Sequence, residues 1–174
     1  MIDKSYFIIS GFQEIGKTHI IGNVALFLEK QYPVVSCYVR NTNQSFLPLV
    51  GTDFIALLKN DHTFILINSA SDDESTCQEL SDFIQNIYLP IKEEGAVERL
   101  VVISSLRKEE RLKAIFEDCI GLNRANDRYF DFHYDINLNI TRQPRNDKIT
   151  RIQYIVPGIT DMAIQILKQP PFWL

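Results

Sequence analysis

The sequence predicts an α/β fold: a three-layer αβα sandwich with a mostly parallel sheet, formed by a single domain over residues 1–174. Short apolar runs of strand length alternate along the chain with amphipathic segments of helix length. The composition, 45% hydrophobic and 23% charged, is that of an ordinary globular protein with one sizeable core. Strands separated by helices of this length form βαβ units, which align strands in parallel and cover both faces of the sheet.

Four strands are predicted from continuous apolar runs, which are typical of strands buried on both faces. Towards the C-terminus, residues 128–140 alternate between apolar and polar side chains and read as a strand, and residues 148–156 read as another. As an alternative to the parallel pattern, these two segments form an antiparallel edge hairpin joined through "TRQPRND". The four apolar runs span residues 6–10, 34–40, 63–70 and 98–106.

Helices are predicted where apolar residues recur at helical spacing. The first of them ends at Pro33, and a Ser-x-x-Glu capping box of Ser71 and Glu74 begins the clearest one. Residues 41–60 are mixed, with a polar loop followed by one or two short helices. The four main helices are predicted over residues 17–32, 71–89, 107–122 and 161–168, the last of them opened by Gly158 and Thr160.

Charge and cysteine content narrow the classes of function. A formal net charge of −4 gives no basic footprint, so we expect no general nucleic-acid binding. The three cysteines are widely spaced and form no zinc-ligand pattern, which favours a reducing compartment. No apolar run approaches the roughly 18 residues of a membrane helix. We therefore expect a cytoplasmic protein without a membrane partner, and the oligomeric state is left open.

The stretch between the first strand and the first helix matches G-x-x-x-x-G-K-[ST] at every fixed position. In such a loop, backbone N–H groups converge on phosphate oxygens, and the following helix N-terminus adds positive partial charge. Lys17 is predicted to reach the β- and γ-phosphates and Thr18 to hold Mg²⁺. The predicted cofactor-binding residues are Gly11, Phe12, Gln13, Glu14, Ile15, Gly16, Lys17, Thr18 and His19.

This stretch resembles the P-loop NTPases, and the resemblance implies a P-loop NTPase-like sandwich that binds ATP with Mg²⁺. Its ending "EIGKT" looks like the end of the P-loop in dethiobiotin synthetases, relatives of the partitioning ATPases, so an acid at position 14 has a precedent. The segment "VVISSLRKEERLKAI" looks somewhat like a strand-Arg-x-x-x-Glu segment of deoxynucleoside monophosphate kinases and phosphomevalonate kinases. No Asn-Lys-x-Asp motif follows a strand, which favours ATP over GTP.

P-loop enzymes usually have a second acid that organises Mg²⁺ at the end of an apolar strand. Here the strand over 63–70 ends in Asn, Ser and Ala, and the acids follow only at Asp72 and Asp73. Asp72 is predicted as a metal-binding residue beside Thr18. The alternative is that both acids only stabilise the N-terminus of the next helix.

Two arginines are predicted to join Lys17 in catalysis, because phosphoryl transfer depends mainly on positioning and charge neutralisation. Arg40 ends the second strand, and Arg107 follows the strand over 98–106. Both belong to the carboxyl edge of the sheet, where open α/β sheets bind ligands. For Arg107, the alternative is a solvated helix start that pairs with neighbouring glutamates.

The sequence thus predicts a small Mg²⁺-dependent phosphotransferase, similar to nucleotide or metabolite kinases. A nucleoside triphosphate is the expected ligand, with a small-molecule phosphate acceptor near Arg40 and residues 41–60. Two alternatives stand beside it. One is an ATPase or ATP-dependent ligase of the dethiobiotin synthetase and partitioning type, and the other is a non-catalytic ATP-binding module.

Overall fold

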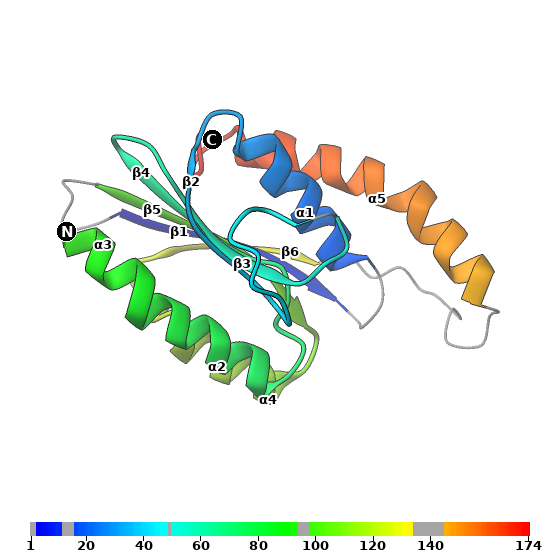
Figure 1. Cartoon of the computed structure of the whole chain (residues 1–174), viewed down its shortest axis with the longest axis horizontal. Helices are drawn as coiled ribbons and strands as arrows, with labels where there is room; N and C mark the ends of the chain where they lie inside the picture. The colour runs from blue at the N-terminus through cyan, green and yellow to red at the C-terminus, as the bar shows by residue number, and fades with distance from the viewer. Residues whose placement is uncertain (1–2, 12–15, 49, 94–97, 134–144) are drawn as a thin grey trace.

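The computed structural model describes residues 3–11, 16–48, 50–93, 98–133 and 145–174, and within them a six-stranded sheet lies between helices (Figure 1). Helix α2 continues through a short π-helical segment, η1, into α3. The elements are β1 (Asp3–Gly11), α1 (Lys17–Leu28), β2 (Val34–Val39), β3 (Phe54–Lys59), β4 (Thr63–Asn68), α2 (Glu74–Phe83), η1 (Ile84–Tyr88), α3 (Leu89–Glu93), β5 (Arg99–Arg107), α4 (Glu110–Cys119), β6 (Arg128–His133) and α5 (Arg145–Leu167).

The strand order is β2-β3-β4-β5-β1-β6, and the sheet is mixed. Strands β4, β5, β1 and β6 run parallel to one another. Strand β3 runs antiparallel to both β2 and β4, with Ile55 opposite Asn68. The α/β class is therefore confirmed, while the sheet is less parallel than expected. Because β3 is reversed, its amino end lies at the same edge as the carboxyl ends of β1, β4 and β5.

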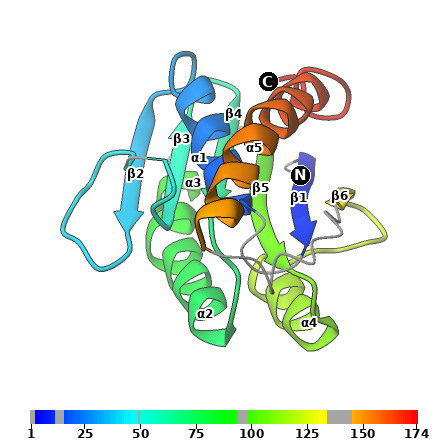
Figure 2. The same cartoon turned by 90° about the vertical axis from the view of Figure 1, so that its right-hand side faces the viewer.

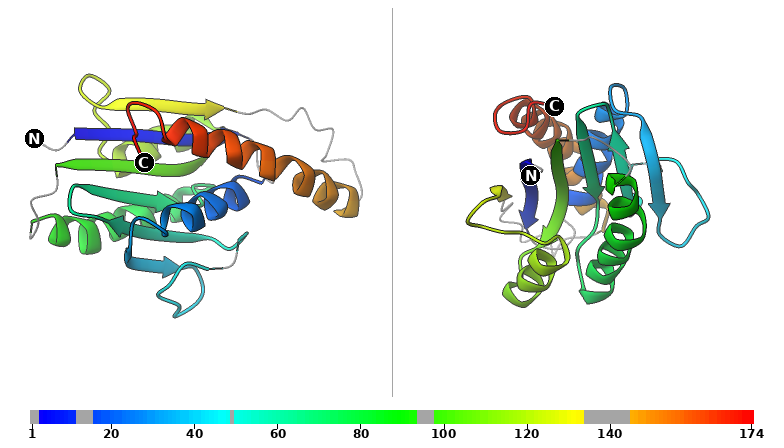
Figure 3. Two further views of the ribbon diagram at one scale, coloured as in Figure 1. Left: turned by 90° about the horizontal axis from the view of Figure 1, so that it is seen from above. Right: turned by 90° about the vertical axis from the view of Figure 1, so that its left-hand side faces the viewer.

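Helices lie on both faces of the sheet, as Figures 2 and 3 show: α1 and α5 on one side, α2, α3 and α4 on the other. A hydrophobic core lies on each face of the sheet. Residues of β1 contribute to the two cores in alternation, because successive side chains of a strand point to opposite faces. Phe7 and Ile9 belong to the core under α1 and α5. Tyr6 and Ile8 belong to the core over α2 and α4. No helix of the described residues is both long and apolar enough to cross a membrane.

The antiparallel hairpin predicted near the C-terminus is wrong. Residues 145–167 form helix α5, with Pro157 inside it, and β6 pairs in parallel with β1. Val156, Ala163 and Leu167 are buried against α1 and the sheet at helical spacing, so packing of this face stabilises the helix despite the proline. Residues 134–144, which include the end of the predicted 128–140 strand, lie outside the described residues.

Two local predictions also need correction. The second half of 41–60 forms strand β3 instead of short helices, and its side chains reach both cores. Helix α2 begins at Glu74 with Asp73 as its N-cap, and the capping box joins Asp73 to Thr76 rather than Ser71 to Glu74. The Ser71 hydroxyl instead accepts a hydrogen bond from the Asn68 amide, 2.7 Å away.

Candidate functional site

The candidate phosphate-binding site lies where β1 ends and α1 begins. Gly11 is the last residue of β1, and Gly16 is the N-cap of α1 with a φ of 93°. That left-handed conformation is costly for any residue with a side chain, which explains the glycine. Lys17 and Thr18 open the helix, so their backbone N–H groups belong to its positively polarised end. The predicted loop residues Phe12, Gln13, Glu14 and Ile15 lie outside the described residues.

Lys17 is buried, with only 5% of its surface exposed, although lysine is rarely buried without compensating partners. Its Nζ donates a hydrogen bond to the carbonyl oxygen of Gly11 over 3.3 Å. Burial lowers the pKa of Lys17; the charge of Asp72 raises this pKa, and that of Arg107 lowers it further. The ammonium group is therefore held at the site, where its positive charge is costly and an anionic ligand would stabilise it.

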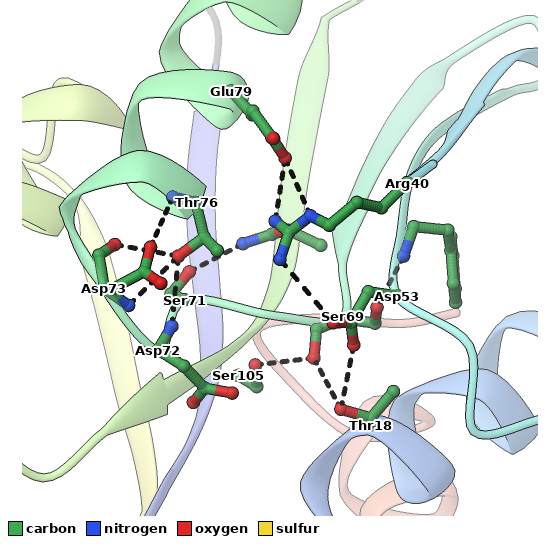
Figure 4. Close-up of polar contacts among 12 residues, drawn as sticks. Thr18, Arg40, Asp53, Ser69, Ser71, Asp72, Asp73, Thr76, Glu79 and Ser105 are labelled. Atoms are coloured by element: carbon green, nitrogen blue, oxygen red, sulfur yellow. Dashed lines mark hydrogen bonds and ion pairs between the residues drawn. The ribbon is translucent and has the colours of Figure 1, made fainter. Parts of the chain in front are cut away.

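Thr18 faces an acid that the sequence analysis did not identify. Its Oγ1 lies 3.3 Å from Oδ1 of Asp53 and 3.3 Å from the carbonyl oxygen of Ser69, as Figure 4 shows. Asp53 immediately precedes β3, the reversed strand, and for this reason it reaches the carboxyl edge. In the sequence, Asp53 stands out only as an acid in front of an apolar run. Placing it at the carboxyl edge requires knowing that β3 runs antiparallel to β4.

Hydrogen bonds between β3 and the end of β4 fix the position of Asp53. The N–H of Phe54 donates to Oγ of Ser69 over 2.8 Å, and the N–H of Ser69 donates back to the Phe54 carbonyl over 3.0 Å. Ser105, on β5, donates to the Ser69 carbonyl over 2.7 Å. The small residues at the end of β4 therefore connect three strands beneath Thr18 and Asp53.

Asp72, the predicted metal-binding residue, lies beyond β4 on the same edge. Its backbone N–H donates to Oγ1 of Thr76 over 3.1 Å, and its carbonyl accepts from Arg107 over 3.4 Å. Its carboxyl atom Oδ1 is buried and has no hydrogen-bond partner among the described residues. The carboxyl group acts on Lys17 through its charge. Asp73 caps helix α2, as the alternative for the two acids expects, and Asp72 directly precedes this N-cap. The buried carboxyl oxygen of Asp72 is not explained by capping.

The two predicted arginines have different surroundings. Nε of Arg40 donates to Glu79 over 2.9 Å, and the guanidinium also lies 3.5 Å from Asp53 (Figure 4). Arg40 therefore links α2 to the acid beside Thr18. Arg107 contacts the main chain after β4 and acts electrostatically on Lys17. The structure brings both arginines to the predicted edge, Arg40 already engaged with two carboxylates.

His19, the last residue of the predicted loop set, is exposed and lies against Gly51. Gly51 has a φ of 94°, and a Cβ there would come within 2.8 Å of Nε2 of His19. The ring therefore packs onto the turn before β3. Its role in cofactor binding remains a prediction.

Oxygen atoms for a hard cation are offered by the Thr18 hydroxyl and the Asp53 carboxylate, which lie 3.3 Å apart. The metal-binding role of Asp72 stays a prediction. No cluster of three or more His, Cys, Asp or Glu side chains suited to a metal occurs within the described ranges. Mg²⁺ does not need such a cluster, because it usually takes one or two carboxylates together with phosphate oxygens and water. The donor set at this edge fits Mg²⁺ bound together with a phosphate ligand.

Comparisons of the chain with models of protein families, with curated proteins and with solved structures find no match. Support for a function therefore comes from the residues of this edge.

Proposed function

We propose that this chain is an ATP-binding protein with a P-loop NTPase-like sandwich, and that it acts as a small Mg²⁺-dependent phosphotransferase. The observation that carries the proposal is the buried Lys17 at the N-terminus of α1, next to the Thr18–Asp53 pair. A buried ammonium group, a helix N-terminus and an oxygen pair for a cation are what Mg²⁺-bound phosphates require.

Each side chain has a distinct role in this proposal. Lys17 and the N–H groups of the first turn of α1 bind the phosphates, and Thr18 and Asp53 hold Mg²⁺. Asp72 opposes the effect of burial on the pKa of Lys17 and thereby favours its charged form. Arg107 neutralises charge that develops during phosphoryl transfer, which is the main catalytic contribution in this class of reaction. Arg40 positions Asp53 through their ion pair.

A non-catalytic ATP-binding module is the second candidate, favoured by the end of β4. Asn68 and Ser69 occupy that end, and the side chains of both are engaged in structural hydrogen bonds. Neither residue can serve as the base that activates a nucleophile. A module would bind ATP without converting it.

The fate of the γ-phosphate of ATP distinguishes a phosphotransferase from an ATPase and from a non-catalytic module. The protein is incubated with γ-³²P-labelled ATP, Mg²⁺ and a panel of small hydroxyl compounds, alongside Lys17→Ala and, as a matched control, Lys92→Ala on α3. We expect label on a small acceptor with the native and control proteins and none with Lys17→Ala. Release of inorganic phosphate alone would instead support the ATPase alternative. Bound ATP that stays intact would support the module.

A further inference from the structure

A second polar site lies on the opposite face of the same edge, over α4. A cavity of about 250 Å³ opens there between the ends of β5, β1 and β6 and the start of α4. Small-molecule pockets usually measure about 300–1,000 Å³, so this one suits a small metabolite rather than a second nucleotide. Its polar lining includes Ser10, Arg107, Lys108, Lys113, Asp131 and His133.

Ser10 connects an acid and a base in the wall of this cavity. Parallel pairing places Ser10 beside His133, and all three polar side chains of the group point to the α4 face. The Ser10 hydroxyl, which is nearly buried, donates to the Asp131 carboxylate and lies 3.1 Å from Nδ1 of His133.

This geometry sets the tautomer of His133. A hydroxyl group has one hydrogen, and here Asp131 accepts it. The Ser10 oxygen can therefore only accept from His133, which places a hydrogen on Nδ1 of the ring. In the neutral ring, Nε2 is then the nitrogen that can take up a proton. A ring nitrogen with a free lone pair is the group that a histidine uses as a general base.

Charges of both signs surround the cavity. Arg107 and Lys108 come from the end of β5 and Lys113 from α4, while Glu109 and Glu110 open α4. With Asp131, three cations and three acids line the space. A ligand that has one anionic group for the cations and a hydroxyl group for the acids or the histidine matches this distribution, whereas a polyanion does not.

Hydrogen bonds link the wall of the cavity to the proposed phosphate site. The Gly11 carbonyl oxygen accepts a hydrogen bond from Nζ of Lys17 over 3.3 Å and one from the N–H of Lys108 over 3.0 Å. Lys17 belongs to the phosphate site and Lys108 lines the cavity. Arg107 likewise lines the cavity and acts on the charge of Lys17. One carbonyl group thus contacts a residue of each site.

We infer that this cavity is the acceptor site, and that the acceptor is a small molecule with one phosphate or carboxylate group and a free hydroxyl group. The inference rests on the proposed phosphotransferase function. This acceptor site differs from the one expected beside Arg40. The guanidinium of Arg40 already forms ion pairs with Glu79 and Asp53. The acceptor hydroxyl gives its proton to Nε2 of His133 while its oxygen bonds to the γ-phosphorus, and ADP leaves with the electron pair of the broken phosphorus–oxygen bond.

The test follows the His133 ring by NMR while glycerol 3-phosphate is added, with glycerol and inorganic phosphate as separate probes. We expect a saturable shift of the His133 signal with glycerol 3-phosphate and weaker binding of either fragment. A Lys108→Gln/Lys113→Gln double variant should lose at least about tenfold in affinity, since two charge-assisted contacts disappear. Lys92→Gln is the matched control and should bind as the native protein does.

Three results of the cavity experiments themselves would overturn the inference. They are the absence of a saturable shift, equal affinity in the double variant, and a ¹⁵N spectrum showing the hydrogen of neutral His133 on Nε2. Glycerol 3-phosphate should also bind to Lys17→Ala, because the cavity does not need that side chain. If the protein binds ATP but the cavity does not bind glycerol 3-phosphate, only the assignment of the acceptor site is overturned. Cavity binding without ATP binding to the native protein would overturn the proposed function, and with it the role as acceptor site.

Discussion

Two acids, Asp53 and Asp72, reach the proposed phosphate site by different routes. Asp72 follows β4, a strand that runs towards this edge, whereas Asp53 precedes β3, which runs away from it. Asp53 accepts a hydrogen bond from the Thr18 hydroxyl, and Asp72 acts on Lys17 by charge and keeps a buried oxygen without a partner. In the proposed function, Asp53 therefore lies on the metal side of the site and Asp72 on the phosphate side.

Strand direction decides which residues can meet at one edge of the sheet. Asp72 follows the end of a strand, whereas Asp53 precedes the start of one. In a mixed sheet the residues before a reversed strand lie at the same edge and need the same attention. If Asp53 binds Mg²⁺ and Asp72 acts on the charge of Lys17, substitution of Asp53 should change Mg²⁺ affinity and substitution of Asp72 should change the pH dependence of stability.

Asp53→Asn should have the largest effect. The affinity for Mg²⁺ in the presence of ATP should fall about 10- to 100-fold, as is typical when a ligand or its supporting group is changed at a metal site. Calorimetric titrations of Mg²⁺ into the protein with ATP measure this change. Asp61→Asn, in the exposed turn between β3 and β4, is the control and should have no effect. An unchanged Mg²⁺ affinity in Asp53→Asn would remove this acid from the metal site.

Ser69→Ala should give the next largest effect, on stability. It leaves the buried N–H of Phe54 without its acceptor, which costs about 1–3 kcal/mol. Ser105→Ala removes a hydrogen bond to a carbonyl that still contacts Thr18, and should cost only about 1 kcal/mol. Urea denaturation of both variants measures the difference. Equal losses would mean that the link between β3 and β4 does not hold Asp53 in place.

The α/β class, most strands and the position of Lys17 at the start of a helix that follows a strand could be predicted from the sequence, because apolar runs and the loop pattern are local signals. The direction of β3 could not, because it depends on pairing with β4 across a tight turn. Nor could α5, whose Pro157 and β-branched residues favour a strand until Val156, Ala163 and Leu167 find a core to cover. The pairing of Ser10 with Asp131 and His133 spans more than a hundred residues and has no local signal either.

A pH dependence distinguishes Asp72 from Asp53. Burial lowers the pKa of Lys17 from its usual 10.5, so the unfolded chain holds this proton more tightly than the fold does. The stability of the ligand-free protein should therefore rise with pH between the lowered pKa and 10.5, while ATP binding weakens.

Asp72→Asn should extend this window to lower pH, because it removes the charge that raises the pKa of Lys17. Denaturation curves are measured for the native protein and for both aspartate variants, each with and without Lys17→Met. The difference isolates the contribution of Lys17 to the pH dependence of stability. A window that moves in Asp53→Asn but not in Asp72→Asn would reverse the roles assigned to the two acids.

The ion pair between Arg40 and Glu79 should have the smallest effect. Both side chains are partly exposed, 22% and 31%, so a double-mutant cycle should give a coupling of at most about 1 kcal/mol. The more exposed pair of Arg111 with Glu74 provides the comparison and should give a coupling near zero. A larger coupling in the exposed pair would contradict the expectation that the less exposed ion pair is the stronger one.

Binding of Mg²⁺·ATP tests the central claim most directly. Calorimetric titrations compare the native protein, Lys17→Ala and Lys92→Ala, each with Mg²⁺ and again with a chelator. We predict saturable binding to the native and control proteins, weakening without Mg²⁺, and none to Lys17→Ala. No binding to the native protein, or equal binding to Lys17→Ala, would show that the turn from β1 into α1 is not a phosphate site.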